Sequence, residues 1–97
     1  MERKIGQLSQ AIADLESADA VRAFLEDLCT IREIQDMAQR LEAARMLEDG
    51  ASYQEVSDEL AISSATIARV NKALHYGAGG YKAVLARLGS QKSRHEG

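Results

Sequence analysis

Two basic side chains, Arg69 and Lys72, stand three residues apart in the segment with the clearest binding chemistry of this 97-residue sequence. Positions three apart share one face of a helix. Small side chains precede them on that face, namely Ser64, Ala65 and Ala68. Short side chains let the end of a helix enter the major groove of DNA, where arginine and lysine bind guanine edges or phosphates. The pattern favours nucleic-acid binding.

The residues around this face have the pattern of a helix-turn-helix over about 52–76. A first helix, begun by a capping box of Ser52 and Glu55, is followed by a tight connection and a second helix that Ser63 can cap. Two helices that cross steeply need apolar side chains at a few inward positions. The inward positions are predicted to be Val56, Leu60, Ile62, Ile67 and Val70.

The outward positions of the same two helices are predicted to contact DNA. Backbone amides at the two helix starts are placed to hold phosphates. At the turn, Ala61 supplies the small residue that the crossing requires, where glycine is commonest. The predicted interface consists of Ser52, Gln54, Ser63, Ser64, Ala65, Ala68, Arg69 and Lys72.

The sequence lacks the residues that a catalytic site or a metal site needs. Cys29 is the only cysteine and is expected to be a buried apolar group. The two histidines, His75 and His95, are too few for a metal site. The glycines of 77–80 follow a predicted helix rather than a strand, which disfavours a nucleotide-binding loop. We therefore expect no enzymatic activity, no metal and no cofactor.

The net charge of −3 argues against nucleic-acid binding, but the charge is unevenly divided. Residues 1–60 hold six Lys and Arg against fourteen Asp and Glu, whereas residues 61–97 hold six against one. Salt confines electrostatic attraction to about 8–10 Å. The basic character of the C-terminal part therefore matters more than the total.

The whole chain is predicted to be all-α, because it has no proline and only 4% aromatic residues. Apolar stripes predict a first helix through Ile5 and Leu15 and a second helix that Asp19 caps. A capping box of Thr30 and Glu33 begins a third helix, which ends at Gly50. A last short helix is expected over 81–88.

These helices are expected to form one domain over 1–89, with a disordered polar tail over 90–97. The apolar content of residues 5–47 is large for so short a chain, so we predict a symmetric homodimer with an extensive apolar interface. The lone cysteine and the absence of long apolar runs predict a cytoplasmic protein with no membrane partner.

The sequence resembles the Trp repressor superfamily, and within it the YerC/YecD-type branch. The resemblance covers about residues 5–88 and implies an intertwined helical dimer whose two helix-turn-helix heads face double-stranded DNA. It also implies transcriptional control, as by a repressor. The stretches that carry it are Phe24–Thr30, Ile34–Arg40, Ala65–Asn71, Leu74–Gly77 and Gly80–Tyr81.

The resemblance also implies a place for a small-molecule effector. In the Trp repressor, bound tryptophan lies between two arginines that correspond to Arg40 and Arg69, near a threonine that corresponds to Thr30. Val70 stands where the family has a glycine that leaves room for the indole, and Ala73 replaces a serine. A β-branched side chain is stiff about χ1 and does not swing away. We predict that L-tryptophan is not the corepressor, and the effector stays unknown.

Two further expectations concern the role of Arg40 and an alternative function. Arg40 is expected to serve a structural ion pair with an acid of the third helix.

An alternative function is a protein-interaction module that keeps the helix-turn-helix shape and binds no DNA, because the chain has no dense basic patch. Salt-dependent binding to random duplex DNA separates the two functions, since phosphate contacts release counterions.

Overall fold

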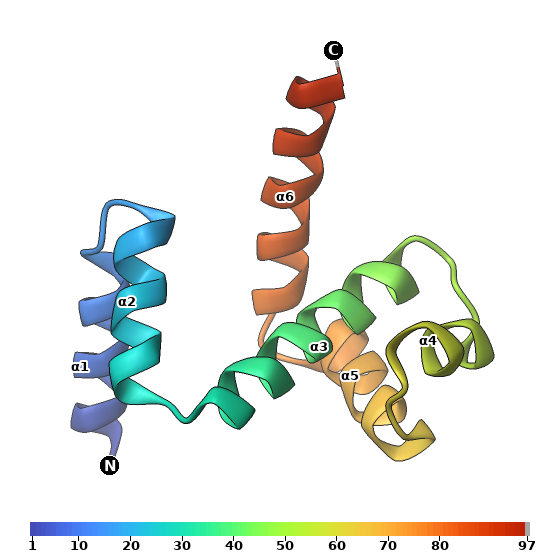
Figure 1. The fold of residues 1–97 in the computed structure, drawn as a ribbon, viewed down its shortest axis with the longest axis horizontal. Coiled ribbons are helices and arrows are strands. Elements are labelled where there is room, and N and C mark those ends of the chain that lie inside the picture. The colour runs from blue at the N-terminus through green and yellow to red at the C-terminus, as the bar shows by residue number, and fades with distance from the viewer. Residues whose placement is uncertain (97) are drawn as a thin grey trace. The chain divides into compact units, whose positions relative to one another are not determined.

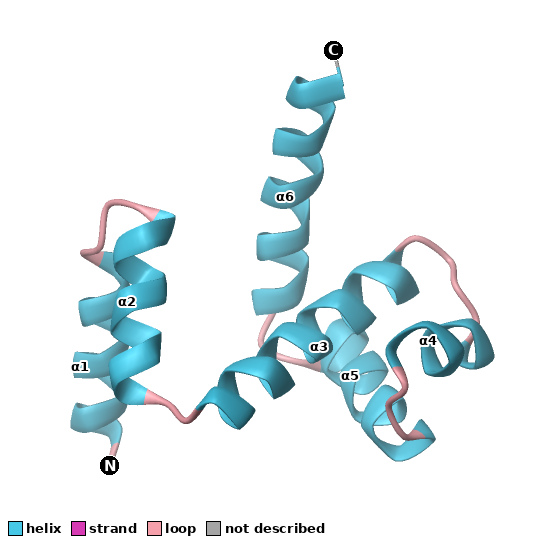
Figure 2. Cartoon of the chain, in the orientation of Figure 1, coloured by secondary structure: helices cyan, strands magenta, loops and turns pink. Residues whose placement is uncertain are grey.

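The computed structural model describes the backbone of residues 1–96 and the side chains of residues 1–89. Every element in the described part is a helix, joined to the next by a short loop (Figures 1 and 2). This confirms the predicted all-α fold class. The helices are α1 (Glu2–Ala13), α2 (Ala18–Leu28), α3 (Ile31–Glu48), α4 (Tyr53–Leu60), α5 (Ser64–Tyr76) and α6 (Gly80–Glu96).

Side-chain caps fix where most of these helices begin. The predicted box at the start of α3 is formed, because Glu33 accepts from the Thr30 amide at 2.8 Å and Thr30 Oγ1 accepts from the Glu33 amide at 3.1 Å. The cap of α2 differs from the prediction. Ser17 Oγ accepts from the Ala20 amide at 3.0 Å, and Asp19 lies inside the first turn. A carboxylate there is still favourable, because it meets the positive end of the helix dipole.

The chain gathers into two compact units, Met1–Gln35 and Asp36–Gly97. The expectation of one domain over 1–89 stays a prediction. The first unit holds α1, α2 and the start of α3. None of the side chains of α1 or α2 is fully buried in the single chain. The apolar stripe of α1 is open to solvent, with Ile5 50% and Leu8 41% exposed. The first unit therefore leaves an uncovered apolar surface.

The second unit has a compact core between the rest of α3 and helices α4 to α6. Helix α5 packs against both α4 and α6. Ala43 and Ala44 are fully buried, and their small side chains let the neighbouring helices come close. Fully or almost fully buried beside them are Val56, Ile67, Val70 and Leu74.

The last helix of this unit is tied to α3 by an ion pair. Lys82 Nζ lies 2.8 Å from Glu48 Oε2. Helix α6 continues past Leu88 to Glu96. The side chains from Ser90 onward, including that of His95, lie outside the described residues, and so does Gly97, so the expectation of a disordered tail over 90–97 stays a prediction. Among the described residues, no helix is long and apolar enough to cross a membrane.

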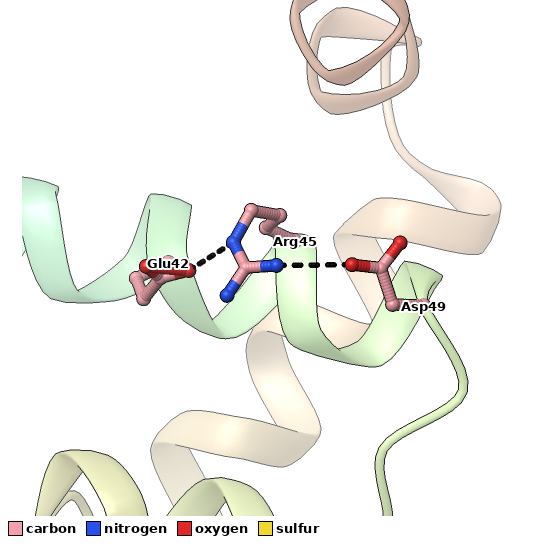
Figure 3. Close-up of polar contacts among 3 residues, drawn as sticks. All are labelled: Glu42, Arg45 and Asp49. Atoms are coloured by element: carbon pink, nitrogen blue, oxygen red, sulfur yellow. Dashed lines mark hydrogen bonds and ion pairs between the residues drawn. The ribbon is translucent and has the colours of Figure 1, made fainter. Parts of the chain in front are cut away.

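Helix α3 carries ion pairs, but Arg40 takes no part in those described. Figure 3 shows Arg45 between two carboxylates of its own helix, Glu42 and Asp49. Its Nη1 lies 2.9 Å from Asp49 Oδ2. The Glu42 hydrogen bond is the main reason why the pKa of Arg45 is raised. The expected ion pair of Arg40 is thus not among those of the described side chains, and Arg40 instead lines a pocket.

Candidate nucleic-acid interface

Helices α4 and α5 form the helix-turn-helix that the sequence predicts, and α5 has two distinct faces. On its inner face, Ile67, Val70 and Leu74 are at most 3% exposed. Val56 of α4 is fully buried against them, and Leu60 and Ile62 are half-buried at the turn. The five residues predicted to hold this helix pair together therefore all pack into the second unit. The buried inner face leaves the opposite side of α5 as its outer face.

The turn between α4 and α5 is fixed by side chains as well as by its backbone. Ala61 adopts a left-handed conformation, with φ 54° and ψ 43°. Ser57 Oγ donates to the Ile62 carbonyl at 3.3 Å. Ser63 Oγ accepts from the Thr66 amide at 3.2 Å and so caps α5 as predicted. The hydrogen bonds of Ser57 and Ser63 thereby hold the first turn of α5 in its orientation.

The outer face offers every residue that the sequence assigned to DNA contact. All eight are exposed in the single chain. Those of α5 combine small side chains in the first turns with two cations beyond them, and the first turn has no acidic residue. The exposed set is Ser52, Gln54, Ser63, Ser64, Ala65, Ala68, Arg69 and Lys72.

The outer face of α4 is acidic, in contrast to that of α5. Glu55, Asp58 and Glu59 are exposed there. Gln54 Nε2 donates to Asp58 Oδ1 at 2.8 Å, so this amide already has an acceptor within its own helix. Carboxylates repel phosphates, and the cations of α5 are therefore the stronger anchors for a nucleic-acid backbone.

The start of α4 is held by a complete capping box whose strength depends on pH. Glu55 accepts from the Ser52 amide at 3.0 Å, and Ser52 Oγ accepts from the Glu55 amide at 3.1 Å. The backbone hydrogen bond from Ser52 is the main cause that lowers the pKa of Glu55 below its ordinary value of 4.5. A carboxyl group whose pKa is lowered by folding stabilises the fold above the unfolded-state value, and this contribution disappears as the pH falls through the folded-state value.

We therefore expect Glu55→Gln to lower the melting temperature at neutral pH, and the difference from the parent to shrink below pH 4.5. Thermal melts followed by circular dichroism at both pH values measure this. Glu59→Gln is the matched control, because it removes an exposed carboxylate of the same helix outside the cap. An equal loss of melting temperature at both pH values would show that the ionised carboxylate is not the cause.

A pocket of about 430 Å³ lies beside the interface, within the second unit. Two arginines line it, Arg40 from α3 and Arg69 from α5. Val70 and Ala73 form part of its wall. Thr30, the third residue predicted for this pocket, lies in the first unit and is not among the residues that line it.

Two further lining residues of the pocket, Thr66 and Tyr81, escaped the sequence reasoning. Thr66 has a signal in the sequence, because it lies three residues before Arg69 and seven before Ala73 on one face of α5. No sequence pattern places Tyr81 at this pocket, because its position depends on the direction that the turn after α5 gives to α6. That turn needs glycine at position 77, where a Cβ atom would lie 2.4 Å from the Ala73 carbonyl oxygen.

Comparison with known proteins agrees with this architecture. Residues 3–89 match the family model of the Trp repressor protein. The uncharacterized protein YerC of Bacillus subtilis (strain 168) is 43% identical over 86 residues, which are 89% of this chain and 83% of that protein.

Solved structures give the same result. A TrpR-like protein from Eubacterium eligens ATCC 27750 superposes with a TM-score of 0.84 at 44% identity, over 90% of each chain. A second solved chain, from Staphylococcus aureus, has a TM-score of 0.83 at 37% identity, over 90% of this chain and 87% of that one. The match spans both helices of the helix-turn-helix and nearly all of the described chain. The chain therefore belongs to the Trp repressor family and is a Trp-repressor-like protein of the YerC type.

Proposed function

We propose that this protein is a sequence-specific DNA-binding transcriptional regulator that acts as a homodimer. The observation that carries the proposal is the outer face of α5, where small side chains precede Arg69 and Lys72. Opposite this face, Ile67 and Val70 anchor the helix in the core. A helix held in this way presents its N-terminal residues to the major groove, which is how helix-turn-helix proteins read DNA.

The uncovered apolar surface of the first unit supports the dimer. Ile12 is 37% exposed on α1, Leu28 51% on α2 and Ile31 68% at the start of α3. Several large apolar side chains left exposed on one compact unit are a feature of interaction sites. A second copy of the chain supplies matching stripes, and a two-fold axis sets the two recognition helices roughly 34 Å apart for a near-palindromic target.

Arg69 and Lys72 are expected to act differently on DNA. Arg69→Ala should weaken binding to the selected sequence by about 1–3 kcal/mol if the arginine reads a base edge. Lys72→Ala should weaken binding to all sequences about equally and reduce the salt slope, because a phosphate contact releases counterions. Sequences are first selected from a random duplex pool, and affinities for selected and random DNA are then measured over a range of salt.

Lys82→Ala is the matched control, because it removes a cation of α6 that is paired with Glu48 and lies outside the proposed interface. If the Arg69 and Lys72 variants bind both kinds of DNA as the parent does, α5 is not the recognition helix. If the parent binds no duplex DNA at low salt, the alternative holds, namely a protein-interaction module with a helix-turn-helix shape. The acidic outer face of α4 is the observation that favours this second candidate.

A further inference from the structure

One side chain of α3 reaches the turn of the helix-turn-helix. Gln39 Nε2 donates to the carbonyl oxygen of Leu60 at 2.8 Å, across 21 positions of sequence. Leu60 is the last residue of α4, and the carbonyl groups in the last turn of a helix have no partner within the helix. The bond is partly buried, so water does not simply replace it.

The carbonyl groups of the turn are thus held from two sides. Gln39 holds that of Leu60 from α3, and Ser57 holds that of Ile62 from α4. Between them Ala61 has φ 54°, a left-handed conformation that is unfavourable for a residue with a Cβ atom. The left-handed residue sets the direction in which the chain leaves α4 and enters α5. A conformation of this kind persists only where its surroundings over-determine it.

We infer that Gln39 is a positioning residue for DNA recognition, acting through the turn and not by touching DNA. The inference rests on the proposed function. By holding the Leu60 carbonyl, Gln39 fixes the turn to α3 and so fixes the angle at which the first turn of α5 meets the major groove. Base contacts require this angle, whereas phosphate contacts tolerate its change, because they depend mainly on charge.

The test is Gln39→Met, which keeps the length of the side chain and removes its donor. Binding to the selected duplex is expected to fall about five- to tenfold, because the variant must restore on binding an orientation of the turn that the parent already holds. Binding to random duplex is expected to stay unchanged, so the specificity ratio falls by the same factor. The amide of Ala61, which donates to the Ser57 carbonyl, is expected to exchange faster with solvent.

Gln35→Met is the matched control, one helical turn earlier on α3 and exposed. It is expected to leave both affinities and the exchange rate as in the parent. A merely structural role for Gln39 would lower binding to selected and random DNA by the same factor, together with the melting temperature, and would overturn the inference. Unchanged specificity and unchanged exchange at Ala61 would also overturn it.

The two proposals fail in distinguishable ways. If the parent binds no duplex DNA, the proposed function fails and the inference fails with it, whatever Gln39→Met does. If the parent prefers its selected sequence and Gln39→Met retains that preference, only the positioning role fails. The exchange measurement needs no DNA, and it reports separately whether Gln39 holds the turn.

Discussion

Leu41→Asp is expected to abolish the homodimer. Ile34, Met37 and Leu41 follow one another on α3 at spacings of three and four, and each is half-buried in the single chain. None of the three is among the described side chains that pack against the core of the second unit. A partner subunit that covers this stripe would bury the new carboxylate without a counter-charge, which costs several kcal/mol.

Sedimentation and circular dichroism at micromolar concentration measure the effect. The Leu41→Asp variant is expected to sediment as a monomer or to lose its helical signal, and to lose DNA binding with it. Gln35→Asp is the matched control, because it places the same carboxylate at an exposed position of the same helix. A parent that sediments as a folded and fully active monomer would contradict the proposed dimer.

Local signals were enough to place most of the helices of this protein. The boxes at Thr30 and Ser52 and the cap at Ser63 act within four residues, and the structure has all three. Where two capping residues compete, the sequence does not decide between them. Ser17 and Asp19 are both good caps, and only the backbone shows that the helix has already begun at Ala18.

Contacts between helices were less accessible to sequence reasoning. The inner face of α5 was predictable, because apolar periodicity alone places Ile67 and Val70 inward. The hydrogen bond from Gln39 to the Leu60 carbonyl was not predictable, because no sequence pattern indicates which group a glutamine on a helix contacts. For the same reason Arg40 was assigned to an ion pair of α3, whereas Arg45 forms the pairs and Arg40 lines the pocket.

The pocket leads to the second large effect, which concerns Val70. Its side chain is only 2% exposed and belongs to the core, although it also lines the pocket. Burying a valine is worth about 1.5–3 kcal/mol, and a glycine inside a helix costs about 0.5–1 kcal/mol relative to alanine. Val70→Gly is therefore expected to lose about 2–4 kcal/mol in denaturant unfolding. Ala68→Gly, at an exposed position of the same helix, is the control and should lose about 1 kcal/mol.

A valine that the core needs does not move aside for a ligand, and this is why we expect no binding of L-tryptophan. The indole would have to enter where Val70 is packed, and Ala73 offers no acceptor to an ammonium group. Two guanidinium groups remain to attract a carboxylate, but they do not create room for a bicyclic ring. Because the chain contains no tryptophan, indole fluorescence in equilibrium dialysis comes from the ligand alone. With the parent protein on one side of the dialysis membrane, the L-tryptophan concentration is expected to be the same on both sides. Micromolar binding with one ligand per subunit would show that the pocket opens despite Val70.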